Sequence, residues 1–158
     1  MKIKAIFTTV LLMCSIITIQ AQNNMFEKLS NHKNISTVYI SKALLGMMPD
    51  MDTGGADIKG LAGKLEQLEI YNGENKDVAK MMKTEVDAMV KNKTYEVLMT
   101  IKDKGENVTF YAHKDKGKFK DLIMFVDKTI EATIIRIVGD FTAEDIQAVM
   151  NGKHTKKK

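Results

Sequence analysis

The stretch that decides the fold is residues 94–141, which read TYEVLMTIKDKGENVTFYAHKDKGKFKDLIMFVDKTIEATIIRIVGDF. In its first half, apolar residues such as Tyr95 and Val97 alternate with polar ones. This alternation is typical of β-strands that bury one face. Two polar segments that contain glycine, residues 103–107 and 114–118, predict hairpin turns. We therefore expect up to four consecutive strands joined by short turns.

The later strands of this stretch have a different pattern. Residues 122–126 are apolar throughout, and so are residues 134–138 apart from Arg136. An apolar run without alternation indicates a central strand that is covered on both faces, or one whose second face meets helices. The sequence alone leaves both possibilities open for these two strands.

The clearest helix precedes this sheet, at residues 76–91. Asn75 is suited to cap its first turn, and Asn92 can adopt the left-handed conformation that ends a helix. Its apolar residues recur at spacings of three and four and form one stripe: Val78, Met81, Met82, Val86, Met89 and Val90. We expect this stripe to cover the inner face of the strands that follow.

The remaining elements are shorter. The sequence predicts a short helix at residues 25–31, a strand at 37–41, a helix at 42–48 that ends before Pro49, and a strand at 65–71. A last helix begins after Thr142, with Asp145 at its third position in a weaker relative of the capping box. Together these elements predict an α+β protein, with a mainly antiparallel sheet of about five strands and helices packed on one face. A ferredoxin-like arrangement is compatible with this order but is not required by it.

The N-terminal residues have the layout of a secretory signal peptide. Lys2 and Lys4 precede an apolar run, and Ala21 offers a small residue at a cleavage point. We expect a signal peptide at residues 1–21, one α+β domain at residues 22–152 and a basic disordered tail at residues 153–158. Export to the periplasm or to the outer membrane follows, with no stable membrane span in the mature chain.

Cys14 is the only cysteine of the chain, and it could be the lipid-modified residue of a lipoprotein. Met13 precedes it where a small residue is usual, and the apolar run continues beyond it. We therefore favour cleavage after Ala21 over lipidation at Cys14. The mature chain would then have no disulfide and no cysteine nucleophile.

The charge distribution argues against nucleic-acid binding. The formal net charge is +4, but six of the 24 basic residues lie in the two terminal segments. The folded part has a mixed charge pattern, whereas a nucleic-acid-binding domain would cluster Lys and Arg on one face. We expect neither a nucleic-acid partner nor a basic binding surface.

The loop around residues 50–57 contains two patterns that resemble known sites. Asp52, Thr53 and Gly54 spell the aspartic-protease triplet, but that chemistry needs two carboxylates that share a proton. Asp50 and the acids after it suggest a calcium loop, but Leu61 stands where an EF-hand has its bidentate glutamate. A polar loop is the simpler interpretation of both patterns.

We expect no bound metal or cofactor and no catalytic residues. Met47, Met48 and Met51 could bind Cu(I) as thioethers, yet most of the 12 methionines fall at positions where Met fills a core. His32 and His113 are isolated in the sequence and lack the spacing of metal ligands. No nucleophile, base and oxyanion site occur together, so we expect that the protein is not an enzyme.

Several segments resemble the domain-of-unknown-function family 4252 of exported Bacteroidota proteins. They are VYISKAL at residues 38–44, Met48-Pro49, IKGL at 58–61, LEI at 68–70 and FTAEDIQ at 141–147. The resemblance covers nearly all of the mature chain and implies a small envelope protein, with relatives that are sometimes lipoproteins. It implies no activity, ligand or catalytic residue that could be carried over.

Two functions remain open. The first is a non-catalytic module that binds a protein or peptide of the cell envelope, through a free sheet edge or through the loop at Met47, Met48, Met51 and Asp52. The second is a protein that binds a small apolar ligand between the sheet and the Met-rich helices. The sequence does not predict the oligomeric state.

Overall fold

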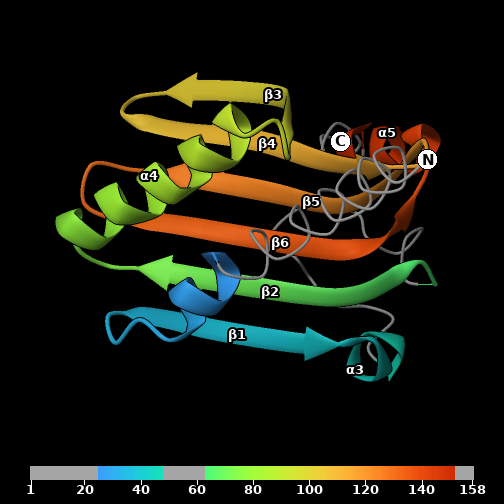
Figure 1. Ribbon diagram of the computed structural model, residues 1–158, viewed down its shortest axis with the longest axis horizontal. Helices are drawn as coiled ribbons and strands as arrows, with labels where there is room; N and C mark the ends of the chain where they lie inside the picture. Colours follow the sequence, from blue (N-terminus) through green and yellow to red (C-terminus); the bar gives the residue numbers. More distant parts are fainter. Residues whose placement is uncertain (1–24, 48–62, 152–158) are drawn as a thin grey trace, which may run out of the picture.

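The protein is a twisted six-stranded antiparallel sheet with helices on both faces (Figure 1). The computed structural model describes residues 25–47 and 63–151, with side chains described up to residue 147. The strands are β1 (Ile35–Ser41), β2 (Leu65–Gly73), β3 (Glu96–Asp103), β4 (Glu106–Asp115), β5 (Lys118–Asp127) and β6 (Ala132–Phe141). The helices are a short one at residues 25–30, α3 (Lys42–Met47), α4 (Lys76–Lys91) and α5 (Ala143–Asn151).

The strand order is β1-β2-β6-β5-β4-β3, and each neighbouring pair is antiparallel. The predicted α+β class and antiparallel sheet are confirmed, with six strands instead of about five. The last four strands form a meander, and β2 adds to its final strand, β6. This topology makes β1 and β3 the two edges of the sheet.

Two tight turns set the register of the meander. Lys104 and Gly105 join β3 to β4, and Lys116 and Gly117 join β4 to β5, all four with positive φ. Two consecutive left-handed residues match the twist of a β-hairpin, and glycine adopts this conformation without strain. The turns are therefore shorter than the polar segments that predicted them, because the strands extend into those segments.

The long helix α4 matches the predicted residues. The side chain of Asn75 accepts a hydrogen bond from the amide of Val78 at 3.0 Å, which confirms it as the N-cap. The prediction for Asn92 is wrong, because its φ is −78° and its amide still donates to the carbonyl of Ala88. Lys93 takes the left-handed conformation instead, with φ 56°.

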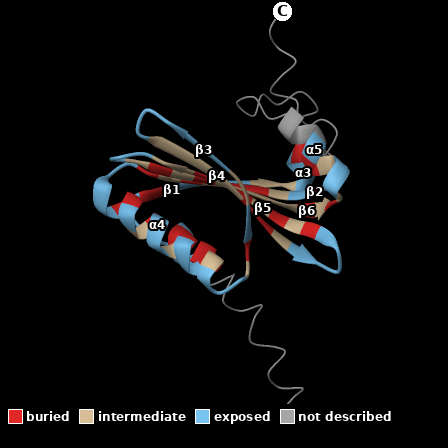
Figure 2. Ribbon diagram, turned by 90° about the horizontal axis from the view of Figure 1, so that it is seen from above, coloured by how far each residue is buried: buried red, intermediate tan, exposed pale blue. Residues whose placement is uncertain are grey.

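The main core lies between the sheet and the helical layer formed by α4 and residues 25–30 (Figure 2). Its largest members include Phe26, Tyr71, Met82, Ile123 and Ile134, all almost completely buried. Burying a side chain of this size stabilises the fold by roughly 1.5–3 kcal/mol. The expectation that the long helix covers the inner face of the meander is confirmed.

The other face of the sheet is covered only in part by described residues. Leu45 of α3 and Ile146 of α5 pack on Leu68 and Ala112 at one end of the sheet. Figure 2 shows both helices on the side of the sheet opposite α4. As expected, helices on one face of the sheet cover the main core. The two short helices α3 and α5 additionally cover one end of the opposite face.

Candidate functional site

A row of apolar side chains crosses the sheet on the face opposite α4. The register pairs Val38 with Ile70, Ile70 with Ile135, Ile135 with Met124, Met124 with Phe110, and Phe110 with Met99. Each of the six strands contributes one residue to this row. We call these six residues the apolar row.

No residue of the apolar row is buried. Val38 is 50% exposed, and the other five are half-buried. The row beside it, which includes Leu68 and Ala112, lies under α3 and α5. Residues directly opposite each other across strands touch, so the apolar row is one continuous surface.

The apolar row ends at β1, which is an unprotected edge strand. Its sequence is ISTVYIS, without a charged residue, a proline or a register shift. Val38 and Tyr39, on opposite faces of the strand, are 50% and 59% exposed. Figure 1 shows β1 as the outermost strand, with α3 beyond its C-terminal end. An uncharged edge of this kind can pair with a further strand.

The opposite edge strand, β3, has the features that prevent such pairing. Its register shifts between Val97 and Met99, and it carries Glu96, Lys102 and Asp103. Bulges and charges are the usual protection of natural sheet edges. The two edges of one sheet therefore differ, and only β1 is open in this sense.

Charged groups are also buried on the α4 face of the sheet. Arg136 donates from Nε to Asp121 at 2.7 Å and from a terminal nitrogen to Glu69 at 3.0 Å. The hydroxyls of Tyr71 and Tyr95 donate to Glu69 and Asp121 at 2.8 and 2.9 Å. These contacts link β2, β5 and β6 into one polar cluster below the helices.

The cluster is a structural network and not an open site. The guanidinium carbon of Arg136 lies 3.9 Å from the centre of the Phe26 ring, so the short helix at residues 25–30 covers the charge. Burial raises the pKa of Asp121, and Arg136 opposes this effect. Burial and the neighbouring Glu69 likewise raise the pKa of Tyr71. Buried charges of this kind need their partners, which makes the cluster a determinant of strand register.

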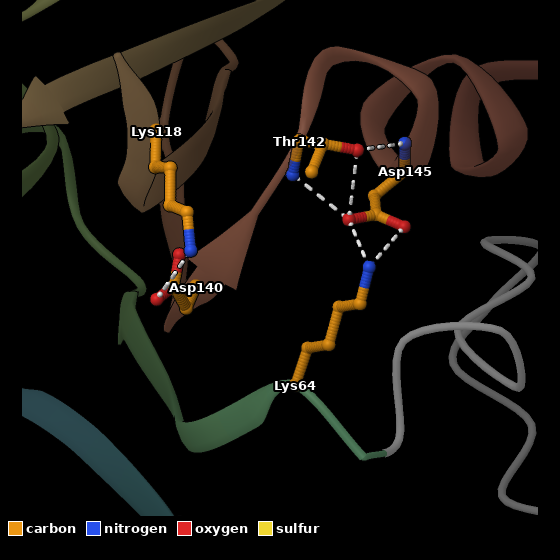
Figure 3. Close-up of polar contacts among 5 residues, drawn as sticks. All are labelled: Lys64, Lys118, Asp140, Thr142 and Asp145. Carbon is orange, nitrogen blue, oxygen red and sulfur yellow. Dashed lines mark hydrogen bonds and ion pairs between the residues drawn. The ribbon is translucent and has the colours of Figure 1, made fainter. Parts of the chain in front are cut away.

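A second polar cluster attaches α5 to the sheet (Figure 3). Asp145 accepts hydrogen bonds from the amide of Thr142 at 2.8 Å and from Lys64 at 2.6 Å. The amide of Asp145 approaches the Thr142 hydroxyl oxygen at 3.4 Å. The predicted cap is confirmed, and Lys64 extends it to the start of β2. Nearby, Lys118 approaches Asp140 at 3.3 Å.

Of the four predicted binding residues, the structure describes one. Met47 is the last residue of α3, the helix that directly follows β1, and is 73% exposed. Met48, Met51 and Asp52 lie outside the described residues, as does the loop that holds the protease-like and calcium-like patterns. The predicted signal peptide, Cys14 and the predicted basic tail also lie outside the described residues.

The histidines that the structure describes have structural contacts. His113 Nδ1 lies 2.7 Å from the carbonyl oxygen of Thr94, and His32 Nδ1 accepts from the amide of Asn34 at 3.2 Å. Within residues 25–47 and 63–147, no group of three His, Cys, Asp or Glu side chains is arranged to hold a metal ion. In the same part of the chain, no helix has the length and hydropathy needed to cross a bilayer.

The chain was compared with families of known proteins. The family model for a domain of unknown function, DUF4252, matches residues 26–149, which include every element of the described sheet. The chain belongs to the DUF4252 family. No curated protein and no solved structure matches it.

The open edge was only partly foreseeable from the sequence. The alternation around Val38 predicts a strand, and a free sheet edge was expected without being located. The available signal was the lack of charge in residues 35–41 compared with residues 96–103. This difference in charge points to an open edge only once the strand order shows that both segments are edge strands.

Proposed function

We propose that this DUF4252 protein is a non-catalytic interaction module of the cell envelope. It binds an extended protein segment along the outer edge of β1, with the adjoining apolar row as part of the contact surface. The observation that carries this proposal is the difference between an uncharged, unshifted β1 and a charged, shifted β3.

The chemistry of the edge favours a protein partner. An edge strand offers backbone N–H and C=O groups at regular spacing, which an added strand satisfies while its side chains contact both faces. On β1, Val38 would contact the partner on the apolar face, and Tyr39 would do so on the face of α4. The N-terminal pattern at residues 1–21 supports an envelope location, where the partner would be found.

Binding of a small apolar ligand is the less favoured function. Met82 and Met89 of α4 are buried in the main core, where they contact other core side chains. This is the ordinary packing role of methionine. Among the described residues, by contrast, the edge strand β1 exposes the side chains of Val38 and Tyr39.

The test compares two lysine substitutions on the same sheet face. Val38→Lys places a charge on β1, and Ile101→Lys does so on β3, where Ile101 is 44% exposed. Each variant, expressed as the full chain with its own N-terminal segment, is used to recover bound proteins from envelope extract, with quantification by mass spectrometry. We expect Val38→Lys to lose at least one partner that wild type and Ile101→Lys both retain.

The matched exposure of the two positions makes the comparison specific. If every recovered protein binds Val38→Lys as well as wild type, the edge of β1 is not the binding surface and the proposal fails. A loss in both variants would also contradict it, since a general effect of charge on the sheet face would then be sufficient.

A further inference from the structure

We infer that the segment bound at β1 is the β1 strand of a second copy of this chain. This inference rests on the proposed function and names its partner. The two strands would run antiparallel around a two-fold axis at Val38, so that one continuous sheet passes through both copies.

The sequence of β1 is self-complementary in this register. Val38 is the central residue of the seven in Ile35–Ser41, so a two-fold axis there pairs all seven residues. Thr37 then lies opposite the second copy's Tyr39, and Ser36 opposite its Ile40. Aromatic and β-branched residues stabilise each other across antiparallel strands. No like charges meet, because the strand has none.

The same register joins the apolar rows of the two copies. In each copy the row runs from Met99 on β3 to Val38 on β1. Pairing Val38 with the second copy's Val38 makes the two rows one unbroken strip. A shift by one residue would move every β1 side chain to the other face of the partner's sheet. The continuity of the rows therefore favours this register over its neighbours.

The position of α3 is compatible with this arrangement. The helix continues directly from Ser41, and antiparallel pairing places Ser41 opposite the second copy's Ile35. Leu44 and Met47, which are exposed on α3, would then border the residues that precede the partner's β1. In this arrangement Met47, which the sequence predicts as a binding residue, would contribute to the contact between the two copies.

Self-pairing at Val38 can be tested by disulfide trapping. Directly opposed residues in an antiparallel pair have Cα atoms about 4.5–5.5 Å apart, within the range that a disulfide spans. The Val38→Cys chain, kept at full length with its own N-terminal segment, should form a disulfide-linked dimer under mild oxidation. Wild type is the control for any cross-link through Cys14.

Ser36→Cys is the matched control within β1. Ser36 is exposed on the same face as Val38, but the two copies of residue 36 would lie about 14 Å apart along the strand direction. We expect a dimer yield at least about tenfold lower for Ser36→Cys. Combining Ser36→Cys with Ile40→Cys should restore the cross-link, since these residues face each other in the proposed register.

The outcomes separate the inference from the proposed function. Equal trapping of Val38→Cys and Ser36→Cys, or trapping of neither together with a monomer in light scattering at every concentration, would overturn self-pairing. The proposed function fails if Val38→Lys leaves the recovered envelope proteins unchanged, or if Ile101→Lys loses the same proteins. If Val38→Lys loses a different protein while the chain is monomeric, β1 serves a foreign partner, and the inference of self-pairing is wrong.

Discussion

Gly139 occupies a position in β6 that leaves no room for a side chain. A Cβ atom there would lie 2.4 Å from the carbonyl oxygen of Lys64 and 2.3 Å from the ring of Phe141. The amide of Asp140 donates a hydrogen bond to the same carbonyl oxygen at 3.2 Å, and this bond holds the backbone of β6 close to that of Lys64. The glycine therefore permits the close approach of β6 to the start of β2.

Gly139→Ala should destabilise the protein by about 1–3 kcal/mol, the usual cost of overpacking a core. Gly46→Ala is the control, because a Cβ at Gly46 meets no atom within 4 Å. In helix α3, that change should stabilise by about 0.5–1 kcal/mol. Urea unfolding measures the free energy of unfolding of both variants. An unchanged value for Gly139→Ala would show that the neighbouring atoms move apart to accommodate the added methyl group.

Arg136 should be needed because it neutralises two carboxylates that the fold buries. Arg136→Met leaves Asp121 and Glu69 without their cation, and removal of one partner from a buried ion pair costs about 3–5 kcal/mol. Lys118→Met is the control, since Lys118 and Asp140 form an exposed pair that contributes little to the free energy of unfolding. Comparable losses in the two variants would contradict this account of the cluster.

The Arg136→Met loss should depend on pH. Burial raises the folded-state pKa of Asp121 above its usual 3.8, and removing Arg136 removes the main opposing effect. A carboxyl with a raised folded-state pKa weakens the fold as pH rises through that pKa. The difference in unfolding free energy between variant and wild type should therefore shrink as pH falls from about 7 to about 4. A difference that stays constant would mean that Asp121 is not the group responsible.

At the scale of elements, α5 is held by a carboxylate with a lowered pKa. The hydrogen bond from Lys64 and the amide of Thr142 hold the pKa of Asp145 below its usual 3.8. Such a group stabilises the folded state above its unfolded-state pKa, and this contribution is lost as pH falls through the folded-state pKa. The attachment of α5 should therefore weaken only under strongly acidic conditions.

Carbon-detected NMR titration of Asp145 measures this directly. We expect a midpoint below 3.8 in wild type and a rise toward 3.8 in Lys64→Met, because the variant removes the largest cause. Lys118→Met should leave the Asp145 midpoint unchanged, since Lys118 contacts Asp140 (Figure 3). A wild-type midpoint at or above 3.8 would mean that the Lys64 contact is absent in solution.

The elements themselves were largely predictable, because they follow from local patterns. Helix α4 has the predicted residues, since its apolar stripe and the Asn75 cap both act within a few residues. The residue that ends this helix was not predictable, because Lys93 adopts the left-handed conformation that is usual for glycine or asparagine. The strands also extend beyond their predicted ends, because the polar residues beside each hairpin turn still pair with the neighbouring strand.

The strand order was not predictable, and the candidate site depends on it. Nothing local in β2 indicates that it pairs with β6, more than 60 residues later, with α4 and three strands between them. This pairing decides that β1 is an edge and that Val38 ends the apolar row. The sequence showed uncharged and charged strands, but only the topology shows which of them are exposed to a partner.

In the described part of the chain, the sheet has one protected and one open edge, and this difference is the central claim. Hydrogen exchange at single-amide resolution tests it most directly, with the full chain measured at increasing protein concentration. Half of the β1 amides point away from β2, and their exchange should slow as concentration rises, while the outward amides of β3 should exchange at constant rates. Equal, concentration-independent exchange at both edges would contradict the self-pairing of β1, through which the open edge is expected to act.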